Sequence, residues 1–381
     1  MSRNGRRRDA AIALLIACVR EDEPFDLERA SRLLSATTPT DLLAAAAYHG
    51  VSGWAYDRLR VLPDASDDLV GELRDRYDDA VRGHLRATWE LASLAPILDA
   101  DAVRWVVIKG MAVVELIYAS PGVRPYGDID VLVEPARFDE VLTRLQEHGS
   151  QLLDRNWTVI RRDRLGELHL RLPGGTPLDL HWNVVNMYRG RIRIEAHELL
   201  DRAVRANLGG VVAPTLDPTD TMIHLALHAT LAGGDRLRWM KDVALAASRR
   251  PPDWDALTAR AEAWGVGTPV GFMLQRARTV LGAPIPDQIP RRLLPRSYRA
   301  VMRLVDAVSP WESARGRLTT PSLLLTRSMG LGLGGAAGWL VSRTLARLDP
   351  REPAASSTFT PRGDERDLAA FLADVVITGR R

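Results

Sequence analysis

The chain has 381 residues, of which 46% are hydrophobic and 26% are charged, and its net charge is +3. This length can bury a sizeable core and favours two or three subdomains, while the even spread of basic and acidic residues excludes an obvious nucleic-acid footprint. The single cysteine, Cys18, excludes an internal disulfide framework and indicates a reducing, cytoplasmic compartment.

Residues 8–100 predict a region that is almost wholly helical. Their Ala- and Leu-rich segments repeat with helical spacing and are broken at Pro39, Gly50 and Pro63. The apolar stretch 10–19 follows basic residues, as in a secretory signal, but it is short and acidic residues follow it at once. We therefore interpret this stretch as a core helix.

A predicted strand over 103–108 ends at Lys109-Gly110, and a helical stretch follows over 111–118. A strand, a glycine at a tight turn and a helix N-terminus together form a place where backbone N–H groups receive phosphate. Lys109 would add a positive charge there. The turn is therefore a candidate phosphate-binding element.

Asp128 and Asp130 stand at the head of a predicted strand over 129–134. Because side chains alternate along a strand, both carboxylates point to one side and the apolar residues point to the other. Two carboxylates held close together raise each other's pKa unless a cation lies between them. Oxygen ligands of this kind suit Mg²⁺ or Mn²⁺, which phosphate chemistry uses. The alternative is a solvated Asp pair, which is common at strand starts.

The next stretch predicts one helix and then three strands, over 136–148, 157–162, 167–172 and 177–182. Gly174-Gly175 marks a hairpin turn between the last two strands. The final strand carries Asp179 and His181 on one face. A third carboxylate is therefore available to the site.

From 218 to about 308 the pattern is helical again. His224 and His228 lie on one helix face, at a spacing that can hold a transition metal. No third ligand with metal-site spacing stands beside them in the sequence. A structural pair packed under a nucleotide is therefore favoured over a zinc site.

Only two of the 51 basic residues are lysine, namely Lys109 and Lys241. Arginine cannot replace lysine where a compact ammonium must fit beside phosphates, so we predict that both lysines contact phosphates. Arg238 lies three residues before Lys241, shares its helix face and could close on a triphosphate with it. One alternative is that the two lysines remain by chance in a chain that otherwise uses arginine. The other is that the helix presents a solvated basic face paired with Asp235 or Asp242.

The uncharged, glycine-rich segment 328–341 is too short to span a bilayer. Its glycines weaken a helix in water, which favours a loop or a loosely packed helix over membrane contact. The stretch 350–363 is rich in Pro, Ser, Thr and charge, and it predicts a linker before a final helix over 365–376.

These motifs, in this order, resemble the polymerase-β-like nucleotidyltransferases, and within them the group described as uncharacterised nucleotidyltransferase. The resemblance covers about residues 40–245 and rests on an ordered series, which is Lys109-Gly110, Arg124, Gly127 to Asp130, Asp179 to Trp182, His224 with His228, and Lys241-Asp242. The wider superfamily carries Gly-Ser at the turn where this chain has Lys109-Gly110. The phosphate contacts that better known members of the superfamily make at this turn therefore need not occur in this chain.

The resemblance implies in-line transfer of an NMP group from an NTP, taken to be ATP, to a hydroxyl group. It implies that Asp128, Asp130 and Asp179 are the catalytic residues and hold Mg²⁺ or Mn²⁺. Asp179, or with less support His181, would accept the hydroxyl proton. The residues expected to contact the nucleotide are Lys109, Gly110, Arg124, Gly127, His181, Arg238 and Lys241.

We expect an α/β fold with a small mixed sheet of four or five strands, in which strand 129–134 is central. The expected parts are an N-terminal helical region, a nucleotidyltransferase core, a helical region that closes the site, and a tail, over 1–100, 101–210, 211–310 and 311–381. A small molecule, a peptide or a protein is the expected acceptor, without a nucleic-acid or membrane partner. The alternatives are an RNA-directed, toxin-like enzyme and an inactive nucleotide-binding accessory protein.

Overall fold

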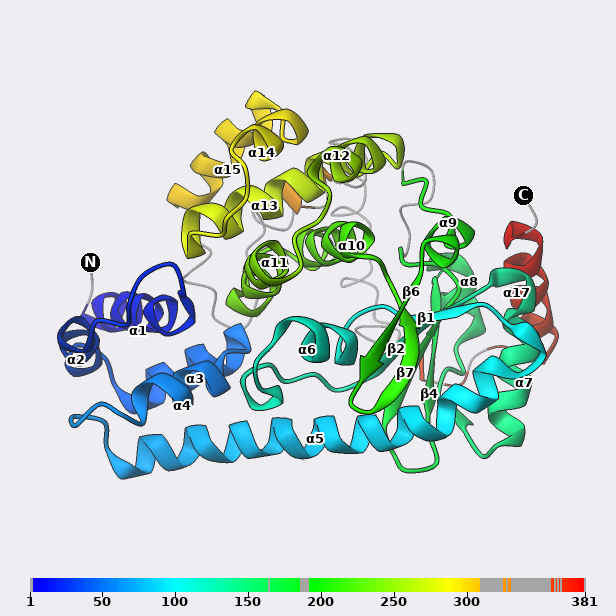
Figure 1. The fold of residues 1–381 in the computed structure, drawn as a ribbon, viewed down its shortest axis with the longest axis horizontal. Helices are drawn as coiled ribbons and strands as arrows, with labels where there is room; N and C mark the ends of the chain where they lie inside the picture. The colour runs from blue at the N-terminus through cyan, green and yellow to red at the C-terminus, as the bar shows by residue number, and fades with distance from the viewer. Residues whose placement is uncertain are drawn as a thin grey trace, which may run out of the picture. The chain divides into compact units, whose positions relative to one another are not determined.

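The computed structural model describes residues 3–163, 165–185, 192–308, 325–326, 328–329, 358–359, 361, 363 and 365–379. The chain forms two compact units, each built from three separate stretches. Unit 1 comprises Met1–His84, Leu116–Tyr126 and Met222–Leu333, and unit 2 comprises Leu85–Glu115, Gly127–Thr221 and Gly334–Arg381. Helices with residues in both units are α5 (Asp67–Asp99), α6 (Met111–Ile117) and α10 (Pro218–Leu231) (Figure 1).

Unit 1 is helical over its described residues. Its remaining elements are α1 (Arg3–Val19), α2 (Leu27–Ser35), α3 (Pro39–His49), α4 (Ser52–Leu59), the 3₁₀ turn η2 (Pro121–Val123), α11 (Leu237–Arg249), α12 (Trp254–Ala263), α13 (Gly267–Leu281), α14 (Gln288–Leu293) and α15 (Arg296–Val308). Helices therefore form in both stretches whose periodicity predicted them, 8–100 and 218–308. Both contribute to the same compact unit.

Helix α3 shows how the sequence sets these boundaries. The Thr38 hydroxyl accepts a hydrogen bond from the Asp41 N–H at 3.1 Å, and Pro39 occupies the first turn, where its missing N–H costs nothing. Gly50 ends the helix at φ +66°, a left-handed conformation that glycine adopts without strain. The predicted breaks at Pro39 and Gly50 are therefore a helix start and a helix end.

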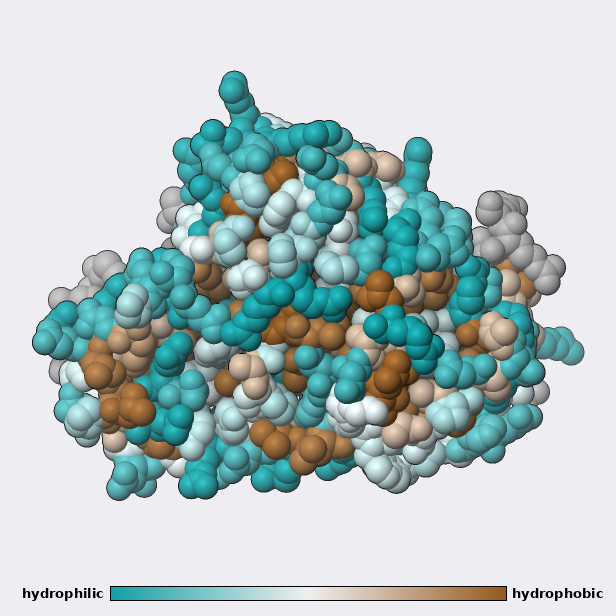
Figure 2. All heavy atoms as spheres, in the orientation of Figure 1, coloured by the Kyte–Doolittle hydropathy of each residue, from teal (hydrophilic) through white to brown (hydrophobic). Residues whose placement is uncertain are grey.

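Helix α1 contains the apolar stretch interpreted as a core helix. Leu14, Leu15 and Cys18 are fully buried in it. In the part of the chain that the structure describes, no helix combines the length and the apolar character needed to cross a membrane. Hydrophilic residues cover most of the face in Figure 2, with apolar residues among them in small groups.

Unit 2 contains a seven-stranded mixed sheet with the order β3-β4-β5-β2-β1-β7-β6. Its strands are β1 (Trp105–Val107), β2 (Ile129–Val133), β3 (Gln151–Leu152), β4 (Glu167–Arg171), β5 (Pro177–His181), β6 (Val204–Leu208) and β7 (Val211–Thr215). The α/β fold class is confirmed, and the strand that carries the Asp pair is central, as predicted. The sheet is larger than the four or five strands expected.

One prediction in this region was wrong, and one hairpin was not predicted. Residues 157–162 were predicted as a strand because they are rich in β-branched and aromatic residues. They form α8 (Trp157–Asp163), because the Asn156 side chain accepts a hydrogen bond from the Val159 N–H and starts a helix there. The hairpin of β6 and β7 was missed, although Gly209 and Gly210 both have positive φ and form the tight turn that joins such strands.

The β4–β5 hairpin forms where Gly174-Gly175 predicted it. Gly175 has φ +91°, and its N–H donates to the Leu172 carbonyl oxygen at 2.8 Å. This turn fixes the antiparallel register, in which Glu167 pairs with His181 and His169 pairs with Asp179. Residues two apart along a strand share a face, so these four side chains lie on one side of the sheet.

The remaining elements of unit 2 are η1 (Ala100–Ala102), η3 (Pro135–Arg137), α7 (Phe138–Glu147), α9 (Ala196–Asp201) and α17 (Glu365–Gly379). The predicted final helix is α17, which packs against η3, α7 and α8 (Figure 1). Trp157 of α8 and Phe371 of α17 have ring centroids 6.2 Å apart. Most of the glycine-rich segment 328–341 and of the stretch 350–363 lies outside the described residues.

A buried ion pair joins two stretches of unit 1. The Arg124 guanidinium donates two hydrogen bonds, each 2.8 Å long, to the Asp242 carboxylate of α11. Tyr118 donates to the same carboxylate at 2.7 Å. Arg124 and Asp242 are 7% and 1% exposed, so each charge depends on the other.

Arg124→Met should lower the free energy of unfolding by about 3–5 kcal/mol, because it leaves the Asp242 charge buried without its partner. Urea unfolding followed by tryptophan fluorescence measures this change. The matched control, Arg32→Gln, removes an exposed pair with Glu28 on α2 and should cost less than about 1 kcal/mol. An equally small cost for both variants would show that the buried pair does not stabilise unit 1.

Candidate active site

Asp130 and Asp179 are brought together by neighbouring parallel strands. Residues of β2 pair with residues of β5, and Asp130 is the register partner of Asp179. Paired residues on adjacent strands place their side chains on the same face of the sheet. The opposite face carries Ile129, Val131 and Leu180, which are fully buried. The alternation of polar and apolar residues therefore puts two carboxylates side by side on one face.

Asp130 is 1% exposed and holds two cationic groups on one oxygen. Its Oδ1 lies 2.8 Å from Lys109 Nζ and 3.1 Å from His181 Nε2. Burial opposes ionisation of Asp130, but the Lys109 ammonium and His181 hold its pKa well below its usual range. Burial likewise opposes the charge of Lys109, and Asp130 raises the Lys109 pKa above its usual range. The two groups form a mutually dependent ion pair.

Asp179 has the opposite electrostatic setting. Its side chain is 14% exposed, and no ammonium or guanidinium is paired with it among the described residues. Burial, and then the negative charge of Asp130, raise the pKa of Asp179 to about 7. Asp130 is therefore held as a carboxylate, while Asp179 has a high affinity for a proton or another cation.

His181 lies between two carboxylates. Its Nε2 faces Asp130, and its Nδ1 lies 3.1 Å from Glu167 Oε2 on β4. Burial opposes its positive charge, but Glu167 and Asp130 raise the pKa of His181 above its usual range. Glu167 was not among the predicted site residues.

A second histidine, His169, was also missed. Its Nδ1 lies 3.0 Å from Asp154 Oδ2, and its Nε2 lies 3.9 Å from Asp179 Oδ1. Burial opposes its positive charge, but Asp154 and then Asp179 raise the pKa of His169 to about 9. In the sequence, Glu167 and His181 lie equally many positions before and after Gly174, and so do His169 and Asp179. The predicted hairpin therefore contained the signal that would have found both β4 residues.

Asp130, Asp179 and His181 form the group of metal-ligand type within the described residues. Their ligand atoms all lie within 4.8 Å of one another. Asp130 Oδ2 is buried and has no hydrogen-bond partner among the described residues, which is costly unless a cation satisfies it. These residues therefore fit a divalent ion.

The other predicted residues of unit 2 are Asp128, Gly127 and Gly110, and the predicted metal ligand Asp128 does not belong to the group of close ligand atoms. Asp128 is half-buried just before β2, and its charge raises the pKa of both Asp179 and Lys109. Gly127 is exposed. Gly110 follows Lys109 with φ +50° and opens α6. The Lys109-Gly110 turn and strand β2 thus meet at the contact between Lys109 and Asp130.

The remaining predicted residues belong to unit 1, where each has partners of its own. Besides the Arg124–Asp242 pair, Arg238 donates to the Pro125 carbonyl oxygen at 3.2 Å. Lys241 Nζ contacts the Val19 carbonyl oxygen at 2.6 Å and Glu21 Oε2 at 3.1 Å. Their contact with a triphosphate stays a prediction.

The histidine pair of α10 also lies in unit 1. The rings of His224 and His228 have centroids 6.2 Å apart, and His228 packs edge-on against Trp239. The pair belongs to no group of three metal-ligand residues within the described part of the chain. The preference for a structural pair over a zinc site agrees with this packing.

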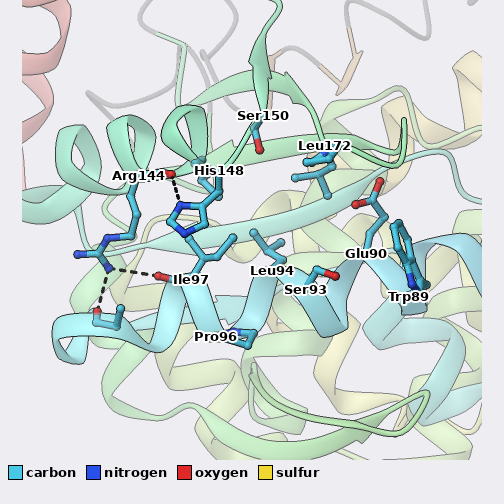
Figure 3. Close-up of a pocket in the computed structure, with 13 residues that line it drawn as sticks. Trp89, Glu90, Ser93, Leu94, Pro96, Ile97, Arg144, His148, Ser150 and Leu172 are labelled. Carbon is cyan, nitrogen blue, oxygen red and sulfur yellow. Dashed lines mark hydrogen bonds between the residues drawn. The ribbon is translucent and has the colours of Figure 1, made fainter.

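A cavity of about 490 Å³ lies elsewhere in unit 2, bordered by α5, α7 and the turn between β4 and β5. Figure 3 shows Trp89 and Glu90 at one end and Arg144 and His148 at the other. Arg144 is held by the carbonyl oxygens of residues 97 and 100. None of the predicted site residues lines this cavity, so it is separate from the carboxylate group.

The geometry agrees with the comparison with known proteins. A family model described as uncharacterised nucleotidyltransferase matches residues 35–282, which is more than half of the chain. The match includes the whole group of charged side chains around Asp130. No curated protein matches the chain at a significant level. The chain belongs to the family of uncharacterised nucleotidyltransferases.

Proposed function

We propose that this protein transfers an NMP group from an NTP, taken to be ATP, to a hydroxyl group of a small molecule, a peptide or a protein. The acceptor oxygen forms a bond to the α-phosphorus, the bond between that phosphorus and the bridging oxygen breaks, and pyrophosphate leaves. The hydroxyl proton passes to a base of the protein. No covalent bond to the protein is needed, so positioning and charge stabilisation carry the reaction.

The observation that supports this proposal most is the pairing of Asp130 with Asp179 on adjacent parallel strands. Two carboxylates side by side repel each other and give the sheet no structural advantage. The buried Oδ2 of Asp130 has no hydrogen-bond partner among the described residues, which fits a cation. In a member of a nucleotidyltransferase family, this arrangement is best explained as a site for a divalent ion and phosphates.

Asp128, Asp130 and Asp179 would hold Mg²⁺ or Mn²⁺ in this proposal. When bound, such an ion neutralises phosphate oxygens and lowers the pKa of the acceptor hydroxyl. Asp130 is kept ionised by Lys109 and His181 and is therefore ready to bind a cation. Its neighbour Asp179 is the more exposed carboxylate, which suits contact with a substrate.

Asp179 is proposed to accept the proton of the acceptor hydroxyl, with His181 as the alternative base. The side chain of Lys109 is 18% exposed, so its ammonium is reachable from solvent while it contacts Asp130. We propose that this ammonium neutralises the triphosphate and the leaving pyrophosphate. Arg124, Arg238 and Lys241 are proposed as further phosphate contacts.

Incubation with each NTP carrying a radioactive α-phosphate, together with candidate hydroxyl acceptors, tests the proposed reaction. Label should move to the acceptor from one or more α-labelled NTPs and should not move from γ-labelled NTPs. Transfer from γ-labelled NTPs would identify a kinase instead. Label appearing in RNA would favour the RNA-directed alternative.

Asp128→Asn combined with Asp130→Asn should abolish the dependence of ATP binding on Mg²⁺ or Mn²⁺, because it removes two charges with little change of volume. Transfer should fall about 10²- to 10⁴-fold, which corresponds to several kcal/mol of lost charge stabilisation. Isothermal titration calorimetry with and without the ion measures the first effect, and the α-label assay measures the second. The control is Asp139→Asn, an exposed residue of α7, which should change neither. Equal ATP affinity with and without the ion in the wild-type protein would refute the metal assignment.

Lys109→Ala should slow transfer by about 30- to 1,000-fold, which is about 2–4 kcal/mol of lost transition-state stabilisation. Lys109→Arg should rescue poorly, because a planar guanidinium does not fit the site of a compact ammonium. Steady-state rates with the preferred NTP measure both effects, and thermal melting checks that the variants fold.

Arg171→Ala, at the exposed end of β4, is the matched control and should keep the wild-type rate. If Lys109→Arg is as fast as the wild-type enzyme, an ammonium is not required at this position. The reason proposed for a lysine in so arginine-rich a chain would then be wrong.

A further inference from the structure

His181 has both ring nitrogens directed at carboxylates from different strands. Nε2 lies 3.1 Å from Asp130 Oδ1 on β2, and Nδ1 lies 3.1 Å from Glu167 Oε2 on β4. The histidine is 4% exposed, so the two carboxylates and the sheet determine the orientation of its ring. A histidine held in this way presents one fixed nitrogen to the volume shared by Asp130 and Asp179.

The contact between Glu167 and Nδ1 of His181 is of the kind that usually supports a metal-binding histidine. Histidines that bind metals usually donate the N–H of the other ring nitrogen to a carboxylate, which fixes the tautomer and makes the ligating nitrogen more basic. Glu167 is placed to accept the Nδ1 proton. In the ion-free protein Nε2 donates its proton to Asp130 Oδ1, and an ion that displaces this proton would bind the Nε2 lone pair on the side of Asp130 and Asp179.

The distances within the group suit one ion. An octahedral ion with bonds of about 2.1 Å holds neighbouring ligand atoms about 3.0 Å apart. One ligand atom from each of Asp130, Asp179 and His181 lies within 4.8 Å of the other two, close to the roughly 4.2 Å that separates opposite ligands of such an ion. Two carboxylates and one imidazole can therefore face a single ion without rearrangement of the sheet.

We propose that His181 is a nitrogen ligand of the divalent ion, that Glu167 positions it, and that the site therefore prefers Mn²⁺ to Mg²⁺. This inference rests on the proposed function. Mg²⁺ favours sites made of oxygen ligands, whereas imidazole nitrogen suits first-row transition metals. Glu167 is a positioning residue, since it contacts His181 and lies outside the group of ligand atoms.

His169 provides a matched control on the same sheet face. Its Nδ1 is also held by a carboxylate, Asp154, at 3.0 Å. Its Nε2, however, lies 3.9 Å from Asp179 Oδ1, and His169 does not belong to the group of mutually close ligand atoms. The two histidines thus differ in distance to the proposed ion site and resemble each other in their carboxylate partners.

Electron paramagnetic resonance of the wild-type protein with Mn²⁺ tests the proposal without any assay of activity. Electron spin echo envelope modulation detects the nitrogen of an imidazole bound directly to Mn²⁺, and this signal is expected in the wild-type protein. Competition with Mg²⁺ gives the preference, which should be on the order of tenfold or more in favour of Mn²⁺.

The variants assign the signal to one histidine. His181→Gln should abolish the nitrogen modulation and most of the preference for Mn²⁺, whereas His169→Gln should keep both. Glu167→Gln should keep the modulation and weaken Mn²⁺ binding by about 10- to 100-fold. Circular dichroism and thermal melting verify folding, and His181→Asn is a second test should His181→Gln not fold.

Absence of nitrogen modulation in the wild-type protein, or its survival in a folded His181 variant, would overturn the inference. So would equal affinity of the wild-type protein for Mn²⁺ and Mg²⁺. These outcomes leave the proposed function standing if α-labelled NTP still reacts. If no divalent ion binds and no NTP reacts, the proposed function fails as well.

Discussion

The buried carboxylate of Asp130 is the constraint on which the site depends. A buried charge costs several kcal/mol unless opposite charges and hydrogen bonds compensate it. Lys109 follows β1 and His181 ends β5, and both contact Asp130 Oδ1, while Glu167 of β4 contacts the far side of His181. Charges of alternating sign therefore run across four neighbouring strands. The strand order β4-β5-β2-β1 is what allows each charge to meet its partner.

The surroundings of the two lysines share a feature that composition could not show and that favours an ammonium over a guanidinium. Lys109 meets a buried carboxylate, and Lys241 meets a carbonyl oxygen, a carboxylate and the face of Trp54, whose ring centroid is 4.4 Å from Nζ. A compact ammonium can satisfy partners that lie in different directions, whereas a guanidinium prefers partners in its own plane. The planar, two-bond contact between Arg124 and Asp242 shows the opposite case in the same chain.

The sequence was sufficient for the central strands of the fold, which carry or adjoin the candidate residues Lys109, Asp130 and Asp179. Strand periodicity located β1, β2, β4 and β5, because each alternates or is continuously apolar and ends at a turn signal. Local pattern could not give the sheet order, which brings β7 beside β1 through residues more than 100 positions apart. Asp154 was missed because its role depends on its contact with His169 across the sheet edge. The partners of Lys241 were equally hidden, since they lie at the other end of the chain.

The interleaving of the two units has a consequence for synthesis on the ribosome. All seven strands lie between Trp105 and Thr215, so the sheet is complete before the last stretch of unit 1 has been made. Helix α1 can pack against α2, α3 and α4 early, but the Lys241 that contacts its last residue is 222 positions later. At about 5–20 residues per second, this delay is about 10–45 s. Through that interval the packing of α1 against α11 and α13 is missing, so unit 1 completes its core only when its last stretch has been made.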